Sequence, residues 1–299
     1  MNKKAITGQQ KKINLGKELR KLCERNRDGS FATQAARRHI LTMCAEQLKE
    51  AGFYNLAPSG LKQKHVKTLV DKWLAEEKTP GAIKNRMAQL RWWAEKIGKP
   101  NVIARDNSIY GIPERTYVTN QSKASTLESE KLAKINDNWI RCSLELQKAF
   151  GLRREECLKF QPQYADLGDR IRLKDSWTKG GKAREIPLRN DYQRSILNKA
   201  HAIAKNGSMI PPEKSYVEQL RLYEGLTKYA GLSKMHGLRH AYAQERYKEL
   251  TGRDCPAQKG KISQELTKDE KTQDLATRLQ ISKELGHERE EVTAVYLGR

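Results

Sequence analysis

The sequence lacks long apolar stretches. None approaches the roughly 20 residues that a membrane-spanning helix needs, and no apolar run follows the basic start Met1-Asn2-Lys3-Lys4. That start is therefore not a secretory signal. The basic residues also form no single amphipathic stretch of the kind that lies on lipid. We expect a cytoplasmic protein without a membrane partner.

Cysteine is also scarce. The 299 residues include five cysteines, an odd number, and no C-x-x-C pair. This pattern argues against a disulfide framework and against a structural zinc site, and it fits a reducing compartment. The sequence shows no internal repeat and no long low-complexity tract.

Acidic residues are few beside basic ones. Asp and Glu number 36 against 58 Lys and Arg, which gives a net charge of +22. So large an excess points to a polyanionic partner, with nucleic acid the leading candidate. The charge is uneven, because residues 1–125 carry +14 and the longer remainder carries +8. We infer two units, the first of which mainly grips the polyanion.

The first part is predicted to be helical. Apolar residues recur at helical spacing in 31–51, in 61–77 and in a helix that starts at Pro80 and ends at Gly98. Basic side chains of this third helix are candidate DNA contacts, although a solvated charged face is the common alternative; they are Lys84, Arg86 and Arg91. We predict a helical domain over 1–98, a linker over 99–125 and a second domain over 126–299.

The second part combines helices with a short hairpin. Ser129 is placed to cap a helix that runs to about Phe150. Residues 169–188 alternate polar and apolar side chains on both sides of Gly180-Gly181, which predicts two antiparallel strands joined by a turn. Helical patterning follows to the end.

Four segments of this part carry reactive residue types. They are Gly151-Leu152-Arg153-Arg154-Glu155-Glu156, Thr178-Lys179-Gly180-Gly181-Lys182-Ala183-Arg184, His236-Gly237-Leu238-Arg239-His240, and Leu285-Gly286-His287 with Tyr296 nine positions later. Each alone has an ordinary explanation, such as a surface arginine, an exposed hairpin tip or a packed tyrosine. The two histidines of the third segment also have the spacing of a metal pair, but Arg239 between them would oppose a cation.

Together these residue types fit phosphoryl transfer. A tyrosine can form a covalent phosphate ester, and a lysine can protonate a departing oxygen. Arginine guanidiniums match the geometry and charge of a phosphate. Histidines can hydrogen-bond the phosphate or accept the tyrosine proton.

The four segments resemble the signature of the tyrosine recombinase, or phage integrase, family. The resemblance assigns catalytic roles to Arg153, Lys179, His236, Arg239, His287 and Tyr296, with the last as nucleophile. Glu156 and His240 would support them, and Lys182 is a fallback for the lysine role. Lys182 and Arg184 are also candidate DNA contacts.

The resemblance implies a mainly α fold with a small antiparallel β-sheet, arranged as a two-domain clamp on DNA. It implies cleavage and rejoining of double-stranded DNA at a specific attachment site through a 3′-phosphotyrosyl bond, without cofactor or metal. A homotetramer on DNA, accessory DNA-bending proteins and a phage or mobile-element setting would follow. A type IB topoisomerase and a non-catalytic DNA-binding regulator are the alternatives.

The sequence departs from the family pattern in two places. Arg239 and His287 lie 48 positions apart, about twice the family distance, and only three residues follow Tyr296. We expect residues 251–280 to be a polar surface insertion outside the active-site core, with Leu275, Leu279 and Ile281 beginning the helical run behind it. The insertion is a candidate contact between subunits, and a disordered loop without a role is an equal alternative.

Overall fold

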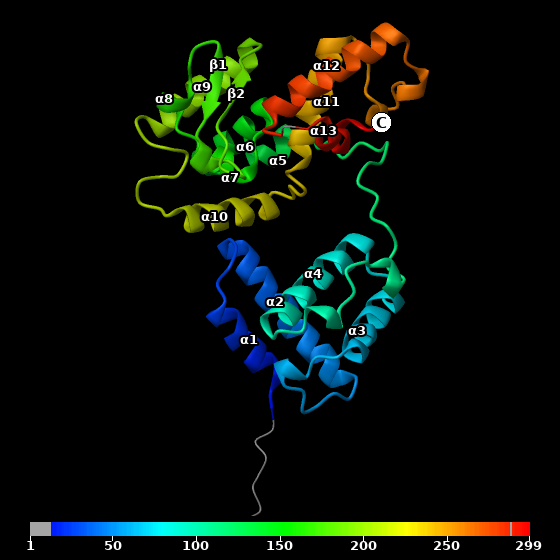
Figure 1. Ribbon diagram of the computed structural model, residues 1–299. Coiled ribbons are helices and arrows are strands. Elements are labelled where there is room, and N and C mark those ends of the chain that lie inside the picture. The colour runs from blue at the N-terminus through cyan, green and yellow to red at the C-terminus, as the bar shows by residue number, and fades with distance from the viewer. Residues whose placement is uncertain (1–12, 288) are drawn as a thin grey trace, which may run out of the picture. The chain divides into compact units, whose positions relative to one another are not determined.

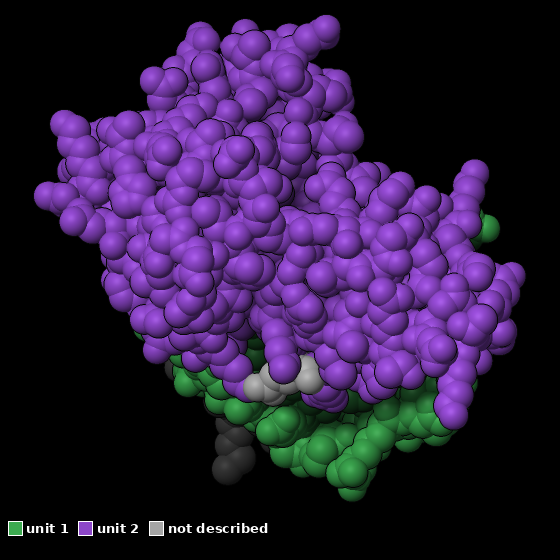
Figure 2. Space-filling view, turned by 90° about the horizontal axis from the view of Figure 1, so that it is seen from above, with its two compact units in different colours: residues 1–116 green, residues 117–299 purple. Residues whose placement is uncertain are grey.

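The computed structural model describes residues 13–287 and 289–299. The chain divides into two compact units, residues 1–116 and 117–299, which are coloured separately in Figure 2. Helices dominate both units, and a two-stranded antiparallel sheet lies in the second (Figure 1). Among the described residues, no helix is both long and apolar enough to span a bilayer.

Capping residues and a proline determine where helices of the first unit begin. Ser30 Oγ accepts from the amide of Thr33 at the start of the second helix, and Pro80 occupies the first turn of the fourth. The helices are α1 (Leu15–Arg25), α2 (Phe31–Glu50), α3 (Gln63–Ala75) and α4 (Pro80–Lys96). Their apolar faces enclose the fully buried Trp73 and Trp93. The expected helices are confirmed, and α1 was not foreseen.

The expected linker over 99–125 is wrong in its first part. Ile103 and Ile112 are buried in the core of the first unit. Short 3₁₀ turns at Pro100–Val102 and Ser108–Tyr110 carry the chain across that core. These turns lack the long periodicity that marks an α-helix, so a pattern search classes such a segment as a connection.

The second unit is built around a helical core that the small sheet flanks. Its helices are α5 (Ser129–Ala133), α6 (Asn138–Phe150), α7 (Arg154–Lys159), α8 (Pro162–Ala165), α9 (Asp191–Ala204), α10 (Tyr216–Tyr229), α11 (Gly237–Thr251), α12 (Lys268–Glu284) and α13 (Glu290–Leu297). The helix expected from Ser129 to Phe150 is interrupted, because Asp137 accepts from the amide of Ile140 and starts a new helix. Figure 1 shows α11, α12 and α13 close together, and they pack on one another.

The expected hairpin is confirmed. Strand β1 (Arg170–Leu173) pairs with β2 (Arg184–Pro187), and Ile171 lies opposite Ile186. These two side chains are buried in the core of the unit. Gly180 and Gly181 adopt positive φ angles of 94° and 65° in the connection, a conformation that glycine adopts at little cost.

Most of residues 251–280 are exposed, but the expectation of a surface insertion is wrong for residues 255–257 and for the buried face of α12. Cys255, Pro256 and Ala257 are buried, and α12 packs on α11 and α13. The segment looks polar because α12 buries only one narrow face, which includes Arg278 and Ile281. Leu275 and Leu279, expected to begin the helical run, lie inside α12, which already starts at Lys268, and both are exposed.

Candidate active site

Arg239 is the centre of the candidate site. It lies in the first turn of α11 and its side chain is fully buried. It donates from Nη1 to the Gly151 carbonyl over 2.6 Å, from Nη2 to the Leu285 carbonyl, and from Nε to Tyr296 Oη over 3.3 Å. Burial lowers the pKa of Arg239 to about 10, so the guanidinium stays charged at neutral pH. Three of the four predicted segments therefore meet at one buried cation.

Arg153 and Glu156 form the second part of the site. The backbone amide of Arg153 donates to Glu156 Oε2 over 2.7 Å, which caps α7, and its Nη1 donates to Oε1 over 2.8 Å. Glu156 is fully buried. Burial alone would raise the pKa of Glu156, but the hydrogen bonds and charge of Arg184, with the charges of Arg239 and Arg153, outweigh it and lower this pKa to about 2. Glu156 is therefore an anion at neutral pH, and it orients the Arg153 guanidinium.

Arg184 is a structural member of the site. Both terminal nitrogens donate to Glu156, over 2.9 and 2.7 Å, and Nε donates to the Glu284 carbonyl over 3.0 Å. Its side chain is 6% exposed. The expectation that Arg184 contacts DNA is therefore wrong. Instead its hydrogen bonds join β2 to α7 and to the Glu284 carbonyl at the end of α12.

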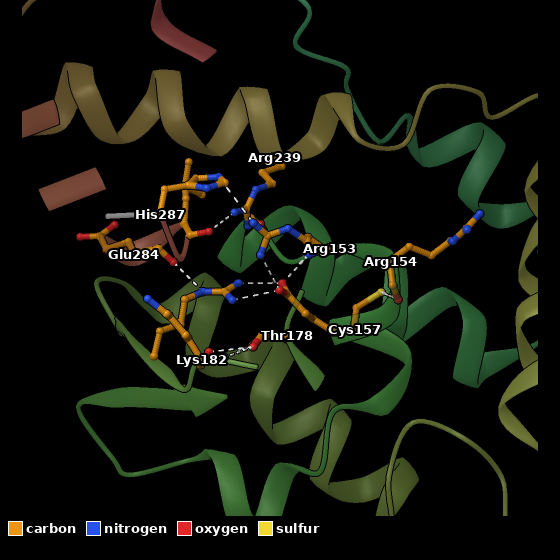
Figure 3. A network of polar contacts seen from close by, with 12 residues as sticks. Arg153, Arg154, Cys157, Thr178, Lys182, Arg239, Glu284 and His287 are labelled. Carbon is orange, nitrogen blue, oxygen red and sulfur yellow. Dashed lines mark hydrogen bonds and ion pairs between the residues drawn. The ribbon is translucent and has the colours of Figure 1, made fainter. Parts of the chain in front are cut away.

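Three histidines surround the tyrosine. The ring centroid of Tyr296 lies 4.6 Å from that of His240 and 6.1 Å from those of His236 and His287. His287 Nε2 lies 3.5 Å from Arg153 Nη2, and it must accept because arginine only donates. Figure 3 shows the side chains of Arg153, Arg239 and His287 converging, while Arg154 points away.

Burial lowers the pKa of all three histidines. The pKa falls to about 4 for His240 and for His287, and it falls also for His236. Neutral imidazoles therefore face the tyrosine at neutral pH. Among the described residues, no group of three or more His, Cys, Asp or Glu side chains could hold a metal ion.

The hairpin lysines lie at the turn between β1 and β2. Thr178 shapes this turn, because its hydroxyl donates to the Lys182 carbonyl and accepts from the Lys182 amide. Lys179 and Lys182 are both exposed. Among the described residues Lys179 makes no hydrogen bond to the arginine–tyrosine cluster. The hairpin is tied to that cluster through Arg184 on β2, and the choice between the two lysines stays a prediction.

The candidate DNA contacts on α4 differ from one another. Arg91 donates to the carbonyls of Ala104 and Arg105 and to Asn107 Oδ1. It therefore holds residues 104–107 against α4, and its predicted role in DNA contact stays a prediction. Arg86 stacks over Trp73 at 5.0 Å, and Lys84 is half-buried. For these two the prediction also stands untested.

Sequence analysis missed a buried support behind the site. Glu284, near the end of α12, accepts from Tyr242 Oη over 2.8 Å and from the Arg246 guanidinium. This pair anchors α12 to α11, directly before the Leu285 carbonyl that receives Arg239. Glu284 follows Ile281 by three positions, so helical spacing placed it near the buried face, but nothing in the sequence named its partners.

The site can bind an anion and attack it. Two guanidiniums stabilise negative charge on an oxyanion, and a tyrosine hydroxyl lies within hydrogen-bond distance of one of them. The neutral histidines can accept or donate a proton. Such a set suits displacement at a phosphate by an oxygen nucleophile without a metal ion.

Comparison with known proteins bears on both units. Residues 13–103 match the family model described as phage integrase, N-terminal, and residues 114–245 match the model described as integrase. A search of curated protein sequences gave no match.

Solved structures of similar fold cover nearly the whole chain. A lambda integrase tetramer bound to a Holliday junction has a TM-score of 0.60 at 16% identity, over 97% of this chain and 80% of that chain. The XerH site-specific recombinase bound to difH substrate has 0.55 at 16%, over 94% and 80%. The Tn1549 transposon integrase with circular intermediate DNA has 0.54 at 13%, over 96% of each.

Proposed function

Because this chain belongs to the phage integrase family of tyrosine recombinases, we propose that it cleaves and rejoins duplex DNA with Tyr296 as the nucleophile. The observation that carries the proposal is the contact between Arg239 Nε and Tyr296 Oη, which places the hydroxyl beside a buried permanent cation. Attack by this hydroxyl would bring the negative charge of a pentavalent phosphate close to the same cation. Tyr296 is itself 6% exposed, so DNA must bring its phosphate to the edge of a preformed site.

The proposed step is an exchange of phosphate esters. Tyr296 Oη forms a bond to phosphorus, and the bond from phosphorus to the 5′ oxygen of the next nucleotide breaks. The tyrosine proton passes to His236, the most exposed of the three histidines, and Lys179 supplies a proton to the departing oxygen. The product is a 3′-phosphotyrosyl bond with a free 5′ hydroxyl.

Each remaining side chain has a distinct task in this step. Arg153 and Arg239 hold the non-bridging oxygens, and His287 donates to one of them from Nδ1 while Nε2 accepts from Arg153. Glu156 and Arg184 fix the Arg153 fork. Attack by the 5′ hydroxyl of a second strand reverses the step, and the energy of the ester bond is kept, so no nucleotide is consumed.

The proposed substrate is a pair of specific attachment sites, brought together by a tetramer. The net charge of +22 supports a polyanionic ligand. Similar structures include a lambda integrase tetramer bound to a Holliday junction and a lambda integrase dimer bound to a core site. For this chain, tetramer assembly and any DNA-bending accessory protein are proposals by analogy.

One variant tests the proposal. The full-length protein would first select its binding site from random-sequence duplexes, and a nicked duplex with that site would then serve as substrate. Wild type should form a detergent-resistant protein–DNA adduct, and Tyr296→Phe should bind the duplex with equal affinity and form none. An adduct with Tyr296→Phe would show that another residue is the nucleophile.

A further inference from the structure

The residues that follow Tyr296 bind to other parts of their own chain, in a binding site for residues 298–299 that is here called the seat. The Arg299 amide donates to Asn120 Oδ1 over 2.9 Å, and Asn120 Nδ2 donates to the Arg299 carbonyl over 2.7 Å. One side-chain amide thus pairs with both backbone groups of one residue. Asn120 is 179 positions away in the sequence and lies just after the boundary between the two units.

Gly298 completes this seat. Its carbonyl accepts from Arg278 Nη1 over 2.9 Å, and its φ angle is +78°. A Cβ at this position would lie 2.7 Å from Asn120 Oδ1 and 2.8 Å from the Ala257 amide nitrogen. Glycine is therefore required on two grounds, conformation and space. The segment that was expected to be an insertion supplies the walls of the seat.

A second tie reaches the tyrosine itself. Gln244 Nε2 donates to the Tyr296 carbonyl over 3.0 Å, and Ser122 Oγ donates to Gln244 Oε1 over 2.9 Å. Gln244 is buried on α11. Residues 120–122 therefore hold the tyrosine-bearing helix at its last turn and at the residues that follow.

We propose that Asn120 and Ser122 are positioning residues that set the place of the Tyr296 hydroxyl. The inference rests on the proposed role of Tyr296 as nucleophile. Helix α13 has eight residues, and so short a helix depends on tertiary contacts for its position. A misplacement of about 1 Å can cost on the order of a hundredfold in rate.

Asn120 and Ser122 lie in the segment that connects the two units, and this location matters for the nucleophile. The chain passes from the first unit into residues 117–122 before it enters any helix of the second unit. A displacement of this connecting segment therefore acts directly on the last turn of α13. The connection between the units becomes part of the machinery that orients the nucleophile.

The test compares cleavage rate with affinity. The probe is the nicked duplex selected by the wild-type protein, used at saturating concentration in a single turnover. The variants are Asn120→Ala, Ser122→Ala and Gly298→Ala, and Asn206→Ala is the matched control because Asn206 is exposed and lies on the same unit. Asn120 is itself exposed, so water can replace its hydrogen bonds and Asn120→Ala should fold.

If these residues position Tyr296, their variants should lose cleavage rate and keep their affinity for DNA. Asn120→Ala should slow adduct formation about tenfold, and Gly298→Ala more, with the dissociation constant for the duplex unchanged. The double variant Asn120→Ala/Gly298→Ala should form adduct no more slowly than Gly298→Ala alone, since both changes disrupt the same contact between Asn120 and residues 298–299. Amide hydrogen exchange should accelerate in the peptide that contains residues 296–299.

A different pattern overturns the proposal. Wild-type rates in Asn120→Ala and Gly298→Ala would show that the seat does not orient the tyrosine. A rate loss equal to the loss of folded protein, with unchanged exchange in 296–299, would show a merely structural role. In both cases the absence of an adduct with Tyr296→Phe would leave the nucleophile assignment intact.

Discussion

Arg239 and Tyr296, 57 positions apart in the sequence, meet through a 3.3 Å hydrogen bond from the guanidinium Nε to the hydroxyl oxygen. The other two ends of the guanidinium are fixed by the carbonyls of Gly151 and Leu285. The cation therefore has no freedom to follow the substrate. Such preorganisation is the main source of transition-state stabilisation in sites of this kind.

Arg239→Lys should abolish most of the cleavage while it leaves DNA affinity largely intact. Lysine keeps the charge but cannot donate to two carbonyls and a hydroxyl at once. Loss of one oxyanion donor typically costs about 10²–10³ in rate. Single-turnover adduct formation with saturating duplex measures it. Normal cleavage with weakened binding would show that Arg239 is only a groove contact.

Acid should destabilise the second unit through Glu156. The folded-state pKa of this carboxyl is lowered to about 2 from its ordinary value of 4.5, so its contribution to stability is fully present above about pH 4.5. The contribution is lost as the pH falls from about 4.5 to about 2, and it amounts to about 3 kcal/mol. Urea unfolding across this range should show a steep loss of stability in wild type.

Glu156→Gln is the matched control for this acid effect. It should be less stable at neutral pH, because the Arg184 guanidinium loses its buried partner. Between pH 4.5 and 2 its free energy of unfolding should then change less than that of wild type. Parallel pH profiles for the two proteins would show that Glu156 has an ordinary pKa.

Lys179 should be the general acid. A substrate with sulfur in place of the 5′-bridging oxygen has a leaving group that needs no proton. It should restore cleavage by Lys179→Ala and should not restore cleavage by Arg153→Ala. Rescue confined to Lys182→Ala would move the role to Lys182, which lies on the same turn.

The two α4 residues Lys84 and Arg91 should respond oppositely to substitution. Lys84→Ala should weaken binding to all duplexes and reduce the slope of log affinity against log salt by about 1. Arg91→Ala should leave that slope unchanged and lower the melting temperature, because Arg91 holds the 104–107 segment. Filter binding at several salt concentrations and thermal unfolding separate the two. A reduced salt slope in Arg91→Ala would identify it as a phosphate contact.

Much of the architecture was available from the sequence because capping, periodicity and turn residues act locally. The apolar stripe of α4 and the Gly180-Gly181 turn are of this kind. Alternation could also have placed Arg184 correctly, since it lies two positions from the buried Ile186 and so faces the core. The charge of Arg184 favoured a prediction of surface DNA contact, and its buried partner Glu156 is 28 positions away in the sequence.

Other contacts of the site could not be predicted from any local sequence pattern. The pairing of Asn120 with Arg299 joins two segments without periodicity. The burial of Pro256 and Ala257 depends on where α12 returns the chain to the site. Long-range contacts of this kind follow from packing, which the residue pattern of either segment alone does not specify.

The most direct test of the account is the chemical identity of the protein–DNA link. The adduct formed on the nicked duplex would be digested with protease and nuclease, and the nucleotide-bearing peptide identified by mass spectrometry. The account predicts that Tyr296 carries the nucleotide through its 3′ phosphate and that the released strand has a free 5′ hydroxyl. A nucleotide on another residue, or a link through a 5′ phosphate, would contradict it.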